Sequence, residues 1–318
     1  MRATLLAFLL TLFVTETVAE TARYDPDLGP NKVRTDQLVL HDAARNKDVA
    51  VKIYYPLGPG PFPVIVFSHG LYGSKDSYFA LGQYWASYGY VSIHPSHDGS
   101  LKDGTYRGTL RQAINDSDLW ESRPEDVSFV IDSLPDIEKR VPELRGKLDS
   151  KRLGVGGHSY GAYTSQAIGG VKVQMPGKSS PRSFADRRIK AIVVLSPQGE
   201  GQMGLTAQSW TDMKLPMLVM YGSRDFGSQH QPPSWRSEPF VKAPAGDKYD
   251  VELEGATHMT FVGPRRPDRP ENDLFKCVKL ESIAFWDAYL KEDSSAKSYL
   301  QSNALNDFSK GTARIDRK

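Results

Sequence analysis

The sequence predicts an α/β protein whose mostly parallel central sheet is covered by helices on both faces. Two observations carry this prediction. Short, almost continuous apolar runs, typical of strands buried on both faces, recur at residues 64–67, 90–93, 191–195 and 217–221. The segments between the runs place apolar residues at helical spacing, as in residues 77–88 and 124–134, where Pro124 suits the first turn of a helix. Strands that alternate with helices indicate right-handed crossovers in one sheet.

The chain begins with a pattern typical of a secretory signal peptide. Arg2 precedes an almost wholly apolar run at residues 3–14, and small residues follow up to Ala19. A membrane span needs about 20 apolar residues, so an uncleaved anchor is the weaker alternative and no stable membrane anchor is expected. We therefore expect cleavage near Ala19, a secreted or periplasmic protein, and a single domain over residues 20–318.

After this leader, the sequence predicts a β-hairpin followed by the alternating strands and helices. Residues 37–40 and 49–55 have strand character, and the turn-rich segment 45–48 lies between them. Three later stretches look irregular and are long enough to shape a cleft, namely residues 98–122, 197–214 and 226–248. Loops that follow the carboxyl ends of parallel strands are the usual place for ligand binding in such folds.

Composition excludes some classes of function. The 318 residues carry a formal net charge of +2 with both signs interspersed, which indicates no nucleic-acid partner. Cys277 is the only cysteine, so the chain cannot form an internal disulfide. Because Cys277 lies within an apolar helical pattern, we expect a small core residue there and not a nucleophile.

The most informative motif is Gly157-His158-Ser159-Tyr160-Gly161, between a strand-like segment at residues 152–156 and a helix-compatible segment at residues 162–168. This setting predicts a nucleophile elbow, a tight turn that exposes a rigidly held serine. The two glycines are expected because any side chain there would collide with the neighbouring strand or helix. A Gly/Ser loop without chemistry is the alternative, since the five-residue pattern also occurs by chance.

A nucleophilic serine needs a histidine that takes the hydroxyl proton. After Ser159 the sequence contains two histidines, His230 and His258. His258 follows the strand-like segment 249–253 and should therefore lie at the carboxyl edge of the sheet, whereas His230 lies in a loop rich in proline and serine. We predict that His258 is the base.

The histidine in turn needs a carboxylate that fixes its tautomer. Asp225 follows the strand-like segment 217–221 through Gly-Ser-Arg, and Glu200 follows the preceding strand. We favour Asp225 because its side chain is shorter and its exit from the strand is tighter. An ordinary turn residue is the alternative interpretation of Asp225.

An oxyanion hole requires backbone N–H groups that face the developing negative charge. The segment 67–71, Phe-Ser-His-Gly-Leu, leads out of a strand and should bring one amide beside the elbow. We predict that the N–H groups of Leu71 and Tyr160 are the two donors. His69 is then expected to be a structural residue of this loop and not a second base.

Together these residues resemble α/β-hydrolase esterases of the group that contains bacterial cutinase-like polyester hydrolases, platelet-activating-factor acetylhydrolases and chlorophyllases. The resemblance covers about residues 48–261, and its most specific segments are residues 63–70, 85–91, 157–161, 221–225 and 255–258. Dienelactone hydrolases are similar in framework, but their nucleophile is a cysteine where this chain has Ser159. The resemblance implies the α/β-hydrolase fold and ester hydrolysis without a cofactor.

The chain departs from these families in two ways. Ala162 stands where many relatives have a second glycine after the elbow, a change that the start of a helix should tolerate. Polyester hydrolases also tend to have disulfides and an aromatic clamp, and this chain can form no internal disulfide. Trp210 and Trp235 are candidates for lining a subsite, but packing or loop anchoring is the interpretation that we favour for both.

A metal site is an alternative for the segment 94–98, His-Pro-Ser-His-Asp, because two histidines and a carboxylate follow a strand there. We interpret the segment as a loop beside the cleft, since no further ligand cluster is evident and a serine triad needs no metal.

The sequence thus predicts an exported serine carboxylic-ester hydrolase that acts on a small-molecule, lipid or polymeric ester, with no cofactor and no metal. Two other classes stay open. The motif at residues 157–163 is also similar to that of prolyl-oligopeptidase-like serine peptidases or amidases, and a hydrolase fold can serve as a non-catalytic binding protein.

Overall fold

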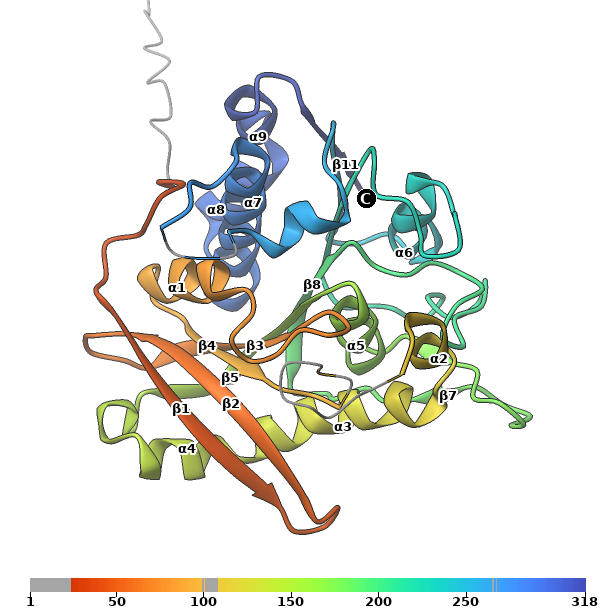
Figure 1. Ribbon diagram of the computed structural model, residues 1–318. Helices are drawn as coiled ribbons and strands as arrows, with labels where there is room; N and C mark the ends of the chain where they lie inside the picture. Colours follow the sequence, from red (N-terminus) through yellow and green to blue (C-terminus); the bar gives the residue numbers. More distant parts are fainter. Residues whose placement is uncertain (1–23, 99, 101–107, 265, 267) are drawn as a thin grey trace, which may run out of the picture.

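The computed structural model describes residues 24–98, 100, 108–264, 266 and 268–318. The predicted signal peptide at residues 1–19, with its cleavage near Ala19, lies outside the described residues. The chain has the α/β-hydrolase fold, with a mostly parallel nine-stranded central sheet and helices on both faces, as the sequence predicted (Figure 1).

The strands of the central sheet follow the order β1-β2-β4-β3-β5-β8-β9-β10-β11. Their bounds are Val33–Asp42 (β1), Lys47–Pro56 (β2), Phe62–Ser68 (β3), Val91–Pro95 (β4), Leu148–His158 (β5), Ile189–Leu195 (β8), Met217–Gly222 (β9), Lys248–Leu253 (β10) and Ala313–Arg317 (β11). The predicted hairpin is confirmed as β1 and β2, which pair antiparallel at one edge. Strands β4, β3, β5, β8, β9 and β10 run parallel, and β11, which the sequence did not indicate, pairs antiparallel with β10 at the other edge. Strands β6 (Lys172–Val173) and β7 (Arg182–Ser183) form a separate small sheet.

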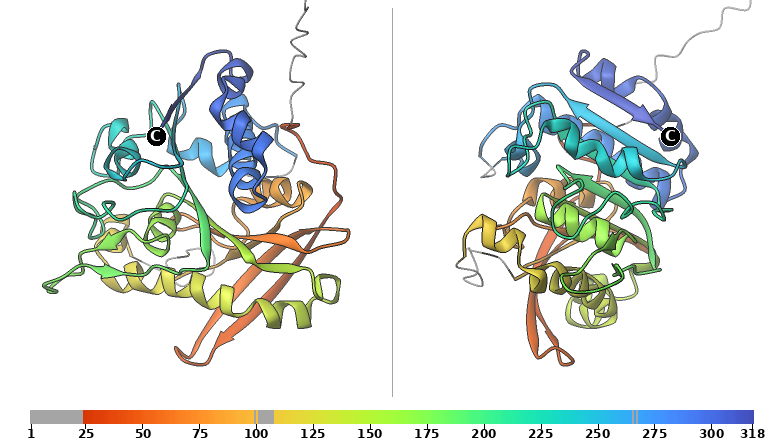
Figure 2. Two further views of the ribbon diagram at one scale, coloured as in Figure 1. Left: turned by 180° about the vertical axis from the view of Figure 1, so that it is seen from behind. Right: turned by 90° about the vertical axis from the view of Figure 1, so that its right-hand side faces the viewer.

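Helices cover both faces of the sheet (Figure 2). One face carries α1 (Phe79–Ser87), α7 (Asp273–Leu290), α8 (Ser294–Gln301) and α9 (Ala304–Phe308), and the other carries α3 (Ser117–Asp132), α4 (Leu134–Arg140) and α5 (Tyr160–Ile168). Shorter helical segments are α2 (Leu110–Ile114), α6 (Glu238–Lys242), η1 (Pro142–Leu144), η2 (Pro233–Ser237) and η3 (His258–Val262). Among the residues that the structure describes, no helix is long and apolar enough to cross a membrane.

The two faces of the sheet have separate hydrophobic cores, which explains the continuous apolar runs of the central strands. In β3, Val64 and Val66 belong to the core under α3 and α5, whereas Ile65 and Phe67 belong to the core under α1 and α7. Alternate residues of a strand point to opposite faces, so both sets must be apolar. Cys277 is buried in the second core, which confirms its prediction as a small core residue.

The stretch 98–122, which we expected to be irregular, contains helical segments, so this expectation was wrong. Helices α2 and α3 begin inside it, and each has an N-cap that the sequence displays. The Thr109 side chain accepts from the backbone of Gln112 in a capping box, and the Asp116 side chain accepts from the N–H of Asp118. The stretch 226–248 likewise contains η2 and α6 and is only partly irregular.

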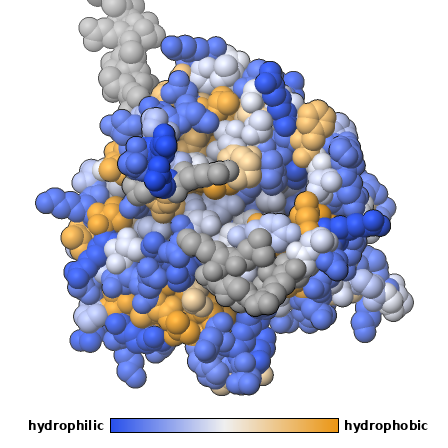
Figure 3. Space-filling view, viewed as in Figure 1, coloured by the Kyte–Doolittle hydropathy of each residue, from blue (hydrophilic) through white to orange (hydrophobic). Residues whose placement is uncertain are grey.

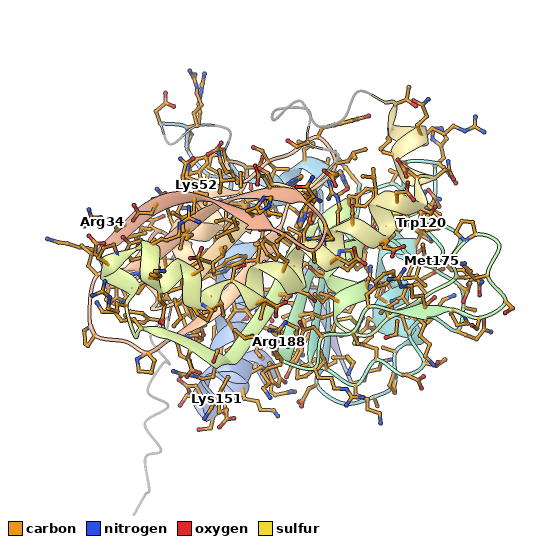
Figure 4. All side chains as sticks on the ribbon, turned by 90° about the horizontal axis from the view of Figure 1, so that it is seen from below. Arg34, Lys52, Trp120, Lys151, Met175 and Arg188 are labelled. Atoms are coloured by element: carbon orange, nitrogen blue, oxygen red, sulfur yellow. The ribbon has the colours of Figure 1, made fainter. Side chains whose placement is uncertain are left out.

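Pro124 consequently lies inside α3 and not in its first turn, as we had expected. A proline has no N–H, so the carbonyl four residues earlier, that of Trp120, loses its partner within the helix. The hydroxyl of Tyr163 on α5 donates to this carbonyl at 3.3 Å. A residue of the neighbouring helix therefore satisfies the acceptor that Pro124 leaves unpaired, and α3 continues through the proline. Figure 4 shows α3 from below, with Trp120 labelled.

Candidate active site

The predicted site residues follow the carboxyl ends of parallel strands and meet at one edge of the sheet. Ser159 follows β5 directly, Asp225 follows β9, and His258 follows β10. Because β5, β8, β9 and β10 are neighbours in this order, their loops lie next to one another. Polar and apolar residues are interspersed on the face of the molecule shown in Figure 3.

Ser159 occupies a strained turn between β5 and α5. Its φ is 55° and its ψ is −119°, an uncommon conformation for a residue with a side chain, and its N–H donates to the Leu195 carbonyl at 2.9 Å. A Cβ on Gly157 would lie 2.1 Å from the Gly161 carbonyl oxygen, and a Cβ on Gly161 would lie 1.9 Å from that of Ser68. Neither position tolerates a side chain, because strand, turn and helix approach so closely.

The structure brings Ser159, His258 and Asp225 together. His258 Nε2 lies 2.9 Å from Ser159 Oγ, and His258 Nδ1 lies 3.0 Å from Asp225 Oδ1. A neutral imidazole that donates from Nδ1 to the carboxylate leaves Nε2 free to accept the serine proton. The Asp225 side chain is fully buried, whereas that of His258 is 34% exposed and so reaches the cleft. This arrangement can activate a hydroxyl as a nucleophile.

The two rival residues lie elsewhere. His230 is exposed in the loop before η2. Glu200 is exposed and pairs with Lys242 of α6, so it does not orient His258. Of the four candidates, His258 and Asp225 are therefore the two that the fold places at Ser159.

Ser196, which the sequence analysis missed, contacts both partners of the serine. Its hydroxyl donates to Asp225 Oδ2 and lies 2.7 Å from His258 Nδ1. It directly follows β8 and adopts a φ of 52°. Its position after a central strand was the only signal in the sequence, since a serine there has many possible partners.

Arg236 was also missed, and it fixes the loop that carries Asp225. Its Nη2 lies 3.2 Å from Asp225 Oδ1, and the buried guanidinium donates to four backbone carbonyls, those of Ser196, Pro197, Asp225 and Phe226. These bonds tie the exit of β8 to the exit of β9. Burial lowers the pKa of Arg236 while Asp225 opposes the shift, and the guanidinium stays charged at physiological pH.

A pocket of about 260 Å³ opens beside Ser159 Oγ. The residues around it are Leu71, Leu110, Ile114, Ser159, Tyr160, Gln198, Gln202, Met203, Phe226, Ser228, Arg236 and His258. Leu71 and Tyr160, whose N–H groups were the predicted oxyanion donors, are thus both at the pocket. Tyr160 is the first residue of α5 and directly follows Ser159.

Two histidines of the sequence-based metal alternative are buried and engaged with protein groups. His97 Nδ1 lies 2.9 Å from Asp126 Oδ2, and His97 Nε2 lies 3.0 Å from Ser68 Oγ, while His94 Nε2 lies 2.9 Å from Ser92 Oγ. Within the described part of the chain, no group of three or more histidine, cysteine, aspartate or glutamate residues could hold a metal ion. The His97 contacts instead hold the start of the 68–71 loop.

His69 lies in the same network. It is 1% exposed, its Nε2 accepts from the His97 N–H at 3.0 Å, and its carbonyl accepts from Arg123 at 2.9 Å. These contacts agree with the structural role that the sequence suggested for it. Trp210 and Trp235 are also buried, and their indole N–H groups donate to Gln166 and to the Glu200 carbonyl, which agrees with packing and anchoring.

The buried histidines predict a loss of stability in acid. Burial lowers the pKa of His69, His94, His97 and His158, to about 3 for His94 and about 4 for His97. Below an unfolded-state pKa of about 6.5 the unfolded chain binds these protons and the folded chain does not. The contribution of these histidines to the free energy of unfolding should therefore fall as pH decreases from 6.5 toward 4, by up to about 1.4 kcal/mol per pH unit for each histidine.

Urea unfolding at several pH values between 7 and 4 measures this slope. His94→Gln should flatten it, because one buried titrating group is lost, and His230→Asn, an exposed control, should leave it unchanged. Equal slopes in all three proteins would contradict the prediction.

The chain is similar in sequence to several known hydrolases. Residues 27–178 match the chlorophyllase family. Over 250 residues, or 78% of the chain, the sequence is 26% identical to Cutinase est1 of Thermobifida alba, of which 67% is covered. Over 252 residues, again 78% of the chain, it is 27% identical to Bis(hydroxyethyl) terephthalate hydrolase of Streptomyces coelicolor, of which 64% is covered. Cutinase 1 of Thermobifida cellulosilytica is 24% identical over 250 residues, which are 78% of the chain and 76% of that protein.

Proposed function

The chain belongs to the serine esterases of the α/β-hydrolase group, and from this premise we propose that it hydrolyses carboxylic esters through an acyl-enzyme on Ser159. The observation that carries the proposal is the pair of contacts that His258 makes, to Ser159 Oγ at 2.9 Å and to Asp225 Oδ1 at 3.0 Å. An elbow serine, a partly exposed imidazole and a buried carboxylate are the set that acyl transfer needs.

In the first half of the reaction, Ser159 Oγ attacks the ester carbonyl carbon and His258 Nε2 takes the hydroxyl proton. The negative charge on the carbonyl oxygen is stabilised by the N–H groups of Leu71 and Tyr160. The bond to the alcohol oxygen then breaks, and His258 donates its proton to this leaving group. The acyl group is left on Ser159.

In the second half, water attacks the acyl carbon while His258 takes one of its protons. The bond to Ser159 Oγ breaks, the serine recovers a proton from His258, and the free acid leaves. Asp225 stabilises the imidazolium in both halves, and the Ser196 hydroxyl and the Arg236 guanidinium hold the carboxylate in place. No cofactor takes part in either half of this proposed reaction.

The pocket supports an ester with an apolar part beside a polar part. Leu71, Ile114 and Met203 offer apolar contact, whereas Gln198 and the other polar residues of the lining offer hydrogen bonds. Because the relatives are named cutinases and a bis(hydroxyethyl) terephthalate hydrolase, we include polyester fragments among the proposed substrates. The apolar run at residues 3–14 supports export of the protein.

A matched substrate pair tests the proposed class of reaction. We expect hydrolysis of p-nitrophenyl butyrate, with much slower cleavage of the butyryl p-nitroanilide that differs only in the leaving atom. Initial rates of both substrates at one enzyme concentration measure the ratio, with Ser159→Ala protein as the background. Dominant anilide cleavage would favour the peptidase or amidase class instead. A panel that runs from acetate to decanoate and includes bis(hydroxyethyl) terephthalate then defines the acyl preference.

A further inference from the structure

A continuous series of hydrogen bonds, buried at Tyr78 and partly buried at His258, joins the loop of the proposed oxyanion hole to the loop of the proposed base. The N–H of Gly70 donates to the Tyr78 hydroxyl at 3.2 Å. The same hydroxyl lies 2.7 Å from His158 Nδ1, and His158 Nε2 lies 3.0 Å from the His258 carbonyl oxygen. Gly70 precedes Leu71, so this series of hydrogen bonds runs from a residue beside a proposed oxyanion donor to the backbone of the proposed base.

The His258 carbonyl oxygen, at the end of this series of hydrogen bonds, fixes the direction of each of them. A carbonyl oxygen can only accept, so His158 Nε2 carries the proton and donates to His258. Burial lowers the pKa of His158 well below its ordinary value, which keeps the ring neutral and leaves Nδ1 as an acceptor. The Tyr78 hydroxyl must therefore donate to Nδ1, and its oxygen accepts from Gly70. Each group in the series is thus a donor where its neighbour can only accept.

The surroundings of Tyr78 fix its ring, so that the hydroxyl contacts Gly70 and His158. Tyr78 does not itself line the pocket beside Ser159. It is 5% exposed, and its ring packs against Phe67 and His158 with centroids 5.1 Å and 5.6 Å away. Its φ is 59°, an uncommon value for an aromatic residue. A Cβ on Gly70 would approach the Tyr78 hydroxyl oxygen to 3.1 Å, so the hydroxyl fits closely against the loop.

We propose that Tyr78 is a positioning residue, whose hydroxyl sets the distance between the oxyanion loop and the His258 loop through His158. The inference rests on the proposed function, because both loops act on one ester carbonyl. Loss of the hydroxyl leaves the Gly70 N–H and His158 Nδ1 without their partner in a buried setting. The two loops then relax independently, and the oxyanion donor and the base lose their common geometry.

Tyr78→Phe tests the proposal, with Tyr90→Phe as the matched control. Tyr90 is also buried, and its hydroxyl donates to Asp287 at 2.7 Å, away from both loops. Each variant loses one buried tyrosine hydroxyl, so their losses in melting temperature should be similar. We expect Tyr78→Phe to lower kcat by about tenfold or more while KM stays within about twofold, and Tyr90→Phe to keep both near wild type.

A change in kcat that is equal in the two variants would overturn the proposal, and so would a rise in KM alone. Two further substitutions test the links on either side of His158 if Tyr78→Phe does not fold. His158→Gln places an amide near the Nε2 position and His158→Asn near the Nδ1 position, so each keeps one link and breaks the other. Both should lower kcat, and wild-type kcat in either would contradict a continuous chain.

The outcome is distinguishable from a failure of the proposed function. A fluorophosphonate probe should label wild-type protein at Ser159 whatever the role of Tyr78. If the probe labels Ser159 and Tyr78→Phe reacts at the rate of Tyr90→Phe, then Tyr78 has no positioning role although the serine mechanism stands. Slower labelling of Tyr78→Phe alone supports the proposal, because phosphonylation uses the same oxyanion donors and base.

Discussion

Replacing Ser159 by alanine is expected to lower kcat for p-nitrophenyl butyrate by about 10⁵- to 10⁶-fold. The variant removes the atom that we propose to form the acyl-enzyme, and the proposed oxyanion donors of Leu71 and Tyr160 remain as the source of residual catalysis. The melting temperature should change little, because the serine makes its side-chain contact with a partly exposed imidazole. Steady-state kinetics and a thermal melt of the same preparation measure both quantities.

Ser128→Ala is the control for this experiment. Ser128 is a serine of α3 whose hydroxyl donates to Asp186 at 3.2 Å and has no part in the site. Its kcat should equal that of the wild type. Turnover by Ser159→Ala at the control's rate would show that the ester is cleaved by another group, and the proposed mechanism would then be wrong.

Asp225→Asn is expected to lower kcat by about 10³- to 10⁴-fold. An amide at this position loses the charge that stabilises the imidazolium. Its NH₂ group would also meet donors, since the Ser196 hydroxyl and the Arg236 guanidinium both donate to the carboxylate. A buried donor that faces other donors costs stability as well, so the melting temperature should fall with kcat.

Glu200→Gln distinguishes this interpretation from the rival one. Glu200 is exposed and pairs with Lys242, so its amide variant should keep the wild-type kcat. The two variants make the same chemical change at neighbouring strand ends. A large loss of kcat in Glu200→Gln together with a small one in Asp225→Asn would reverse the assignment of the acid.

The sequence was sufficient to predict the central strands and to identify candidate site residues in the order serine, acid, histidine. Continuous apolar runs identify strands buried on both faces, and a polar residue directly after such a run must lie at the carboxyl edge of the sheet. Ser159 follows its strand directly, and Asp225 and His258 follow theirs after a short loop. Their proximity follows from the order β5-β8-β9-β10 in the sheet, which only the structure shows.

The residues that support the site could not be predicted in the same way. Arg236 lies in η2, far along the chain from Ser196, and its four carbonyl partners become neighbours only when the exits of β8 and β9 meet. Tyr78 looks like one more apolar residue at the start of α1, because its partners lie elsewhere in the fold, Gly70 in the loop after β3 and His158 at the end of β5. Such roles depend on long-range contacts that a local pattern does not contain.

The helical start of α3 was missed for a different reason. Pro124 in a helical pattern favours a first turn, whereas α3 begins earlier, after the N-cap Asp116. The contact from Tyr163 to the Trp120 carbonyl compensates for the missing N–H of the proline, and it comes from another helix. Tertiary contacts thus override the local preference of Pro124.

The central claim is that Ser159 becomes covalently acylated with His258 as its base, and active-site trapping tests it most directly. Folded protein is incubated with a fluorophosphonate probe, digested, and mapped by mass spectrometry beside the His258→Gln variant. We predict one adduct, on the peptide that contains Ser159, with labelling strongly slowed in His258→Gln. Absence of an adduct, or an adduct on any other residue of the active wild-type protein, would contradict the account.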